Sequence, residues 1–182
     1  MVPQPSATEP DWSREAPERW WDPPRRLLKA MRGYQRRRTS RNPVVRVLSR
    51  WHVLQHRFWS IVCACDIPIN TQIGGGLLLT HPNGVVVHPR ATVGVNCLLF
   101  HQVTLVADVK LGGHVDIGAG AKIIRPVTVG DHARIGANAV VLDDVPPGAT
   151  VVGIPARVIR LPEPDNAGRL TATAAEPTSP RP

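Results

Sequence analysis

An aliphatic residue recurs at every sixth position over more than fifty residues of this 182-residue chain. A small or β-branched apolar residue follows each of them four positions later. Neither an α-helix, with a period of about 3.6 residues, nor an alternating β-strand produces this spacing. The aliphatic positions are Val87, Val93, Leu99, Leu105, Leu111, Ile117, Ile123, Val129, Ile135 and Val141.

A six-residue period is typical of a parallel β-helix built from hexapeptides. Each hexapeptide supplies a short strand and a corner, and three of them form one triangular coil. We expect the aliphatic side chain to point into the prism and the small residue to fit where the wall turns. Because one coil cannot bury its own interior, the stability of such a fold comes from stacked neighbours.

The six-residue register breaks once. Ile67, Ile73 and Leu79 keep it, but the step from Leu79 to Val87 takes eight residues. The two additional residues therefore lie within residues 80–86. Bulges in otherwise regular sheets often re-aim side chains beside active sites, so this segment is the first candidate for function.

Composition divides the chain into four parts. Residues 1–24 and 161–182, rich in proline and polar residues, are expected to be disordered. Residues 25–65 form a basic helical region, in which Asn42-Pro43 has the pattern of a helix start. Apolar residues then recur with the spacing of an amphipathic helix. Residues 66–160 form the β-helix domain.

The net charge of +8 lies entirely in the first 60 residues, which hold 13 Lys and Arg against 5 Asp and Glu. Such an arm could bind nucleic acid, acidic lipid or an anionic ligand, or be a solvated helical face. The β-helix carries no net charge, which argues against a nucleic-acid partner.

The cysteines suggest a reducing compartment. Cys97 occupies a small inward position, and the spacing of Cys63 and Cys65 suits neither a disulfide nor a zinc site. We therefore expect a cytoplasmic protein without a bound metal. No leader-like apolar segment opens the sequence, and the apolar run Phe58–Cys65 is too short to span a bilayer, so no membrane span is predicted.

Several segments resemble the serine acetyltransferases, a branch of the hexapeptide-repeat acyltransferases. The resemblance covers about residues 45–160 and is carried by Cys65–Pro68, Gly76–Val87, Ile117–Ile123 and Val140–Arg157. It implies a left-handed β-helix, a homotrimer with active sites between subunits, and transfer of acetyl from the co-substrate acetyl-CoA to a small-molecule hydroxyl in cysteine biosynthesis.

The resemblance assigns catalysis to His81, with Asp66, 15 residues earlier, orienting it. A hydroxyl is a poor nucleophile near neutral pH, and a histidine can take its proton as attack begins. A carboxylate on the other ring nitrogen fixes the tautomer. We expect direct transfer without a covalent intermediate. His101, two residues after Leu99 as His81 is two after Leu79, is a possible second base or only a surface histidine.

The resemblance also suggests binding residues. Thr80 and Asn83 would line the acceptor pocket. Backbone of small residues would contact the pantetheine arm of CoA, because only small residues allow close approach, and cations would pair with its phosphates. These residues are Gly118, Ala119, Gly120, Gly136 and Ala137 for the arm, and Lys122, Arg134 and Arg157 for the phosphates.

Three departures from the family concern the acceptor and a partner. Thr80 replaces the aspartate that holds the amino group of serine, and the Arg-His loop that grips its carboxylate is missing after Leu105. The sequence ends in Arg181-Pro182 instead of isoleucine, so cysteine synthase is not expected as a partner. The acceptor could therefore be a sugar or another alcohol instead of L-serine.

Two other classes of function remain as alternatives. A zinc carbonic anhydrase on this fold needs three histidines converging on a metal, and the tight histidine pair of such enzymes is absent. A non-catalytic β-helix scaffold or binding protein would not need Asp66 and His81 at their observed spacing.

Overall fold

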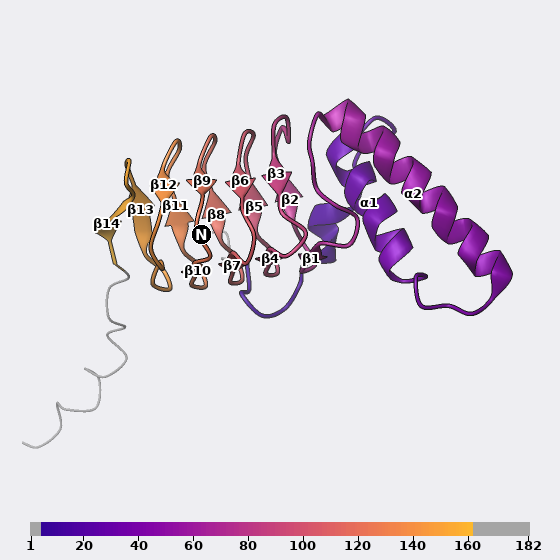
Figure 1. Cartoon of the computed structure of the whole chain (residues 1–182), viewed down its shortest axis with the longest axis horizontal. Coiled ribbons are helices and arrows are strands. Elements are labelled where there is room, and N and C mark those ends of the chain that lie inside the picture. The colour runs from indigo at the N-terminus through magenta and orange to yellow at the C-terminus, as the bar shows by residue number, and fades with distance from the viewer. Residues whose placement is uncertain (1–4, 162–182) are drawn as a thin grey trace, which may run out of the picture.

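The computed structural model describes residues 5–161, and the remaining terminal residues lie outside the described part of the chain. The tail expected to be disordered, 161–182, falls outside it except for its first residue. The described chain forms a stack of β coils with two helices at one end (Figure 1). Among the described residues, no helix is long and apolar enough to cross a membrane.

The strands of the stack form three parallel sheets, ordered β1-β4-β7-β10, β2-β5-β8-β11-β13 and β3-β6-β9-β12. The predicted left-handed parallel β-helix, preceded by a helical region, is confirmed. The strands are β1 (Gln72–Ile73), β2 (Leu78–Leu79), β3 (Val86–Val87), β4 (Thr92–Val93), β5 (Leu98–Leu99), β6 (Thr104–Leu105), β7 (Lys110–Leu111), β8 (Asp116–Ile117), β9 (Lys122–Ile123), β10 (Thr128–Val129), β11 (Arg134–Ile135), β12 (Val140–Val141) and β13 (Thr150–Val152). An antiparallel strand, β14 (Arg157–Arg160), pairs with β13 at the far end.

The interior of the prism follows the sequence period. All ten repeat aliphatics, and the small residues four positions after them, are at most 6% exposed. Burying one such aliphatic side chain stabilises the fold by about 1.5–3 kcal/mol. Cys97 is one of the inward small residues, as predicted, and burial raises the pKa of its thiol to about 11.

Helix α1 (Pro23–Gln35) closes the open end of the prism (Figure 1). Asp22 caps it by accepting from the Arg25 amide at 3.4 Å, and proline at the first helical positions is compatible with the free amides there. Its buried Leu27, Leu28 and Met31 belong to the same apolar cluster as the interior of the first coils. The helix therefore replaces the coil that is missing at this end.

Helix α2 (Pro43–Cys63) packs outside α1. The Asn42 side chain caps it, accepting from the Val44 amide at 2.9 Å, as the sequence predicts. The face that α2 turns inward contains Ser49, His56 and Cys63. His56 Nε2 bonds the carbonyl of Ile67 at 3.0 Å, and burial lowers the pKa of His56 below its ordinary value. None of the large aliphatic side chains of α2 is therefore fully buried.

The expectation of disorder for residues 1–24 is wrong for residues 5–22, here called the strap. The strap runs beside the coils and contains a short 3₁₀ helix, η1 (Trp12–Glu15) (Figure 1). The fully buried side chain of Asn96 donates to the carbonyls of Ser6 (2.8 Å) and Glu9 (2.7 Å) and accepts from the Asp11 amide (2.8 Å). One corner residue of the prism therefore holds the beginning of the strap.

A buried ion pair holds the end of the strap. Arg32 of α1 donates to both carboxylate oxygens of Glu15, at 3.0 and 2.8 Å, and also to the carbonyls of Ile73 and Gly74, at 2.6 Å each. Glu15 in turn accepts from the Leu77 amide at 3.2 Å. Because the charges are paired and hydrogen-bonded on all sides, the cost of their burial is offset. Composition could not reveal contacts between such distant residues.

We predict that Asn96→Ala releases the strap. The substitution removes three hydrogen bonds, each with a net contribution of about 0.5–1.5 kcal/mol, so unfolding should cost about 2–4 kcal/mol less. Hydrogen exchange of residues 5–15 should rise at the same time. Both quantities can be measured on the purified protein.

Asn138→Ala is the matched control, because Asn96 and Asn138 both have a φ of 57° but Asn138 is exposed. Asn138→Ala carries the same free-energy cost of placing alanine in a left-handed backbone conformation, but it leaves the hydrogen bonds to the strap in place. Equal exchange of residues 5–15 in the two variants would contradict the clamping role of Asn96.

Candidate functional site

The break in the six-residue register forms a widened corner between β2 and β3. The sheet ladder continues to Thr80, whose amide donates to the Leu99 carbonyl at 3.0 Å. His81 then adopts a φ of 51°, a left-handed conformation that is uncommon for residues other than glycine. The Asn83 amide donates to the His81 carbonyl at 2.7 Å, and Gly84 completes the turn. The side chain of His81 is exposed.

The backbone joins this corner to the segment that contains Asp66. The Gly84 amide donates to the Ala64 carbonyl at 2.7 Å, and the Asp66 amide donates to the Val85 carbonyl at 2.8 Å. Asp66 therefore pairs with Val86, the first residue of β3, through an isolated parallel bridge. The two segments predicted to carry the catalytic pair are neighbours.

The predicted pairing of Asp66 with His81 depends on how their side chains are oriented. Both are exposed, and none of the hydrogen bonds of the described residues joins them. The charge of Asp66 acts instead on His56, where it opposes part of the lowering of the pKa that burial causes. The pairing of Asp66 with His81 stays a prediction.

A hollow of about 370 Å³ opens beside His81. One wall is the end of β2 with its corner, Leu78–His81, and the other is the strap with the start of α1, within residues 18–25. Charges of both signs line the second wall. Arg25 pairs with Glu18 at 2.7 Å and with Asp22 at 3.1 Å, and Arg19 is exposed.

Sequence analysis missed this second wall, because the strap was expected to be disordered. The local signal was the presence of three tryptophans, Trp12, Trp20 and Trp21, in an otherwise polar stretch. Trp21 lines the hollow, whereas Asp66 and Asn83 do not. Of the predicted catalytic and acceptor-pocket residues, Thr80 and His81 line the hollow.

The remaining predicted residues follow one edge of the prism, here called the His81 edge. It consists of the stacked corners 80–84, 100–102, 118–120 and 136–138. Backbone hydrogen bonds connect each corner to the next: Gln102 N to Asn83 O (2.8 Å), Gly120 N to His101 O (2.9 Å), and Asn138 N to Ala119 O (2.8 Å). The structure thus brings His81, His101 and the predicted CoA-binding corners into one line. His101 is exposed, one coil from His81.

The glycines of this edge have a packing role that the sequence analysis did not anticipate. A Cβ on Gly118 would lie 2.6 Å from the Ala137 amide nitrogen, and one on Gly136 would lie 2.6 Å from Val152 Cγ1. Gly120 has a φ of +72°. Close contact between coils therefore requires glycine here, whether or not a ligand approaches. Ala137 is exposed and Ala119 is half-buried.

The three predicted phosphate partners lie at different distances from the His81 edge. Lys122 on β9 donates to the Gly120 carbonyl at 3.1 Å, and Arg134 on β11 lies 3.7 Å from Asp116. These two residues lie beside the corners 118–120 and 136–138. Arg157 lies on β14 at the far end, with a side chain that is 68% exposed. Exposed pairs of this kind are weak, so the cations stay accessible to an anion.

A second histidine pair lies at a different corner. The Nδ1 atoms of His114 and His132 are 2.9 Å apart on successive coils, and burial lowers the pKa of His114. Sequence analysis did not bring these two together, although they are one coil apart. Over the described residues, no cluster of three or more His, Cys, Asp or Glu side chains is placed to hold a metal ion.

Comparison with known proteins gives consistent results. No protein-family model matches the chain. The serine acetyltransferase of Escherichia coli K12 is 40% identical over 114 residues, which are 58% of this chain and 42% of that protein. The apoenzyme structure of soybean serine acetyltransferase superimposes with a TM-score of 0.63 at 36% identity, over 75% of this chain and 57% of that one. A serine acetyltransferase in complex with CoA superimposes with a TM-score of 0.63 at 29% identity, over 76% and 57% of the two chains.

The chain is similar to serine acetyltransferases in the sequence of its repeats and in its β-helix fold. This confirms the resemblance drawn from the repeat and its motifs. The chain spans only about half the length of the curated serine acetyltransferases it matches.

We predict that Gly118→Ala destabilises the serine acetyltransferase-like fold. The added methyl group would meet backbone of the next coil, which cannot move without disturbing the stack, so the free energy of unfolding should fall by about 1–3 kcal/mol. Urea unfolding measures this change. Ala137→Ser, at an exposed site one coil away, is the control and should leave it nearly unchanged. Unaltered stability of Gly118→Ala, combined with loss of CoA binding, would instead indicate that Gly118 is needed only for the ligand.

Proposed function

We propose that the protein is an acetyl-CoA-dependent O-acetyltransferase in which His81 is the general base. The observation that carries the proposal is the position of His81. It lies at the corner that the two additional residues widen, beside a hollow of about 370 Å³ and at one end of the His81 edge. A pocket of this size suits a small molecule. The names of the relatives, serine acetyltransferases, support the same chemistry.

The reaction follows from general-base catalysis. The imidazole of His81 takes the proton of the acceptor hydroxyl as its oxygen attacks the carbonyl carbon of the thioester. The carbon–sulfur bond then breaks, the acetyl group stays on the acceptor oxygen, and the CoA thiolate recovers the proton from the imidazolium. Each transfer of the proton by a positioned base is worth about 10²–10⁴-fold in rate.

Asp66 would orient the imidazole and stabilise its charged form. The backbone hydrogen bonds between the segment 64–66 and the corner 84–85 support this role, because they keep the carboxylate near the His81 corner.

CoA would extend along the His81 edge. Ala119 and Ala137 leave the corners open for the pantetheine arm, and Lys122 and Arg134 offer cations to its phosphates. Arg157 would reach only the far end of the ligand. His101 lies between the proposed thioester position and these corners, so it is the alternative base.

L-serine is the acceptor that the charges of the hollow favour. Thr80 lacks the carboxylate that the family places before the histidine, but the strap brings the carboxylates of Glu18 and Asp22 to the same hollow. Arg19 and Arg25 lie there as well. A zwitterionic amino acid needs both signs of charge. A sugar or another alcohol is the alternative acceptor, since the Arg-His loop of the family is missing.

We further propose a homotrimer, as in the serine acetyltransferase family that the sequence resembles. Val86 and Ile124, 41% and 47% exposed on the outside of the prism, would contribute apolar surface to subunit contacts. The His81 edge would then lie beside a neighbouring subunit.

We predict that His81→Ala lowers the rate of acetyl transfer at least about a hundredfold. The measurement is release of the CoA thiol with L-serine, hexoses and amino sugars as acceptors. His88→Ala, another histidine on the prism surface but away from the His81 edge, should keep the full rate. A near-normal rate for His81→Ala, with a large loss for His101→Ala, would move the base to His101.

The acceptor series tests the rest of the proposal. Turnover with L-serine supports L-serine as the acceptor. Turnover with sugars alone supports a sugar as the acceptor instead. Without thiol release for any acceptor, the enzyme proposal fails in favour of a non-catalytic scaffold.

Asp66→Asn tests the positioning role separately. Loss of the carboxylate should lower kcat about tenfold or more with little change in the KM of acetyl-CoA, since orientation and charge stabilisation of His81 act in the transition state. A change confined to KM, or unchanged kinetics, would contradict a role of Asp66 in catalysis.

A further inference from the structure

The outward face of α2 is apolar, although an amphipathic helix at the end of a domain normally turns such a face inward. We call it the apolar stripe. Its residues recur every three or four positions and are each between 38% and 80% exposed. They are Val44, Val47, Leu48, Trp51, Leu54, Phe58, Ile61 and Val62. An exposed patch of this extent usually contacts something.

Aromatic side chains extend the apolar stripe at its C-terminal end. Phe58 contacts Trp59 (ring centroids 4.9 Å apart), Trp59 contacts Trp21 (5.5 Å), and Trp21 contacts Trp20 (5.7 Å). Trp20 is 81% exposed. Tryptophan rings favour the boundary between bilayer and water, where one part of the ring is apolar and another is wet.

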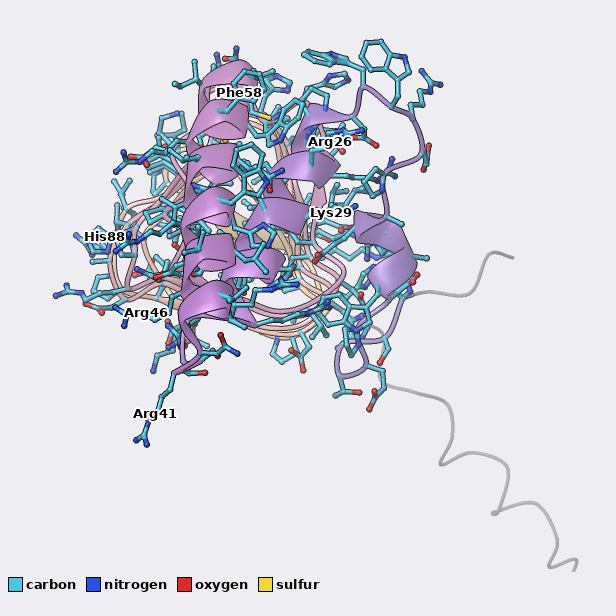
Figure 2. The ribbon with its side chains drawn as sticks, turned by 90° about the vertical axis from the view of Figure 1, so that its right-hand side faces the viewer. Arg26, Lys29, Arg41, Arg46, Phe58 and His88 are labelled. Carbon is cyan, nitrogen blue, oxygen red and sulfur yellow. The ribbon has the colours of Figure 1, made fainter. Side chains whose placement is uncertain are left out.

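Cations lie on both sides of the apolar stripe (Figure 2). Figure 2 looks onto this end of the molecule, with Arg46 and Phe58 toward opposite ends of α2 and with Arg26 and Lys29 on α1 beside it. Residues 23–65 contain eleven Lys and Arg residues and no Asp or Glu. The surface around the apolar stripe therefore has one sign of charge.

One group of these cations surrounds a hollow of about 180 Å³ beside α2. We call it the arginine hollow. Its lining residues are Tyr34, Arg37, Arg38, Arg46, Ser49 and Arg50. Within the described part of the chain, no carboxylate pairs with any of these four arginines. Guanidinium groups bind phosphate well because they offer several donors in a planar fork.

We propose that this end of the protein docks on the surface of an anionic phospholipid membrane, with α2 lying in the plane of the interface. An apolar face with Trp, Phe and Leu, bordered by Arg and Lys, is the pattern of helices that lie on membranes without crossing them. The apolar stripe would enter the boundary of the acyl chains, and the arginine hollow would receive a lipid phosphate.

The charges favour a membrane over a second copy of the chain. Packing α2 against α2 of another copy around a two-fold axis would bring arginines to arginines, with no acidic side chain on either helix to compensate. An anionic lipid surface supplies the missing negative charge together with an apolar layer. The proposal is independent of the acetyltransferase reaction.

The test is sedimentation of the full-length protein with vesicles. We expect binding to vesicles of phosphatidylcholine mixed with phosphatidylglycerol and little binding to phosphatidylcholine alone. Salt should weaken the binding, because part of the attraction is electrostatic. Inorganic phosphate at the same ionic strength should compete no better than chloride, which distinguishes a lipid surface from a site for free phosphate.

Two double variants separate the contributions. Val47→Ser with Leu54→Ser should lower the bound fraction at least about tenfold, because apolar groups leave the acyl boundary. Arg46→Glu with Arg50→Glu should remove the preference for the anionic vesicles. The controls are Val158→Ser with Ile159→Ser and Arg125→Glu with Arg160→Glu. They change the same residue types at exposed positions on the β-helix, so these variants should bind as the unchanged protein does.

Circular dichroism and sedimentation equilibrium of each variant complete the experiment. Unchanged vesicle binding by the Val47, Leu54 variant, or equal binding to neutral and anionic vesicles, would overturn the proposal. A smaller assembly in that variant would show that a second copy covers the apolar stripe, and this would also overturn it. Thiol release from acetyl-CoA should persist in all the folded variants, since none of the altered residues lines the hollow beside His81.

Discussion

The stacking of coils on one another organises this protein. Strands β1 to β12 are only two residues long, so none of them could persist alone. Stability comes from the pairing of each coil with its neighbours and from the aliphatic residues inside. The stacking also places residues 18 positions apart side by side on the surface, as the pairing of Thr92 with Lys110 illustrates. The His81 edge and the histidine pair of His114 and His132 are both products of this register.

A structure built from identical steps makes any departure from them conspicuous. At the corner of His81 the chain takes two additional residues and opens beside a hollow. Asn96 and Glu15 tie the strap to the prism, and the following residues, 18–25, form the second wall of the hollow. The proposed reaction site therefore depends on a segment that does not belong to the repeat.

The repeat and the corner of His81 could be predicted because the evidence for them is local and periodic. The strap could not, since it is ordered by single polar residues that lie about 60 to 90 positions away along the chain. The spacing of apolar residues identified α2 correctly but could not say which face would be buried. Ser49, His56 and Cys63 face inward, and His56 is held by the carbonyl of Ile67. The contact of Asp66 with His81 is a matter of side-chain orientation, which spacing alone does not determine.

The central claim is that the His81 edge binds acetyl-CoA with the thioester at the widened corner. A crystal structure of the protein with CoA tests it most directly. The account predicts that CoA lies along the corners 100–102, 118–120 and 136–138, with its sulfur beside the imidazole of His81. CoA bound on another face of the prism, or with its sulfur at the opposite end of this edge, would contradict the account.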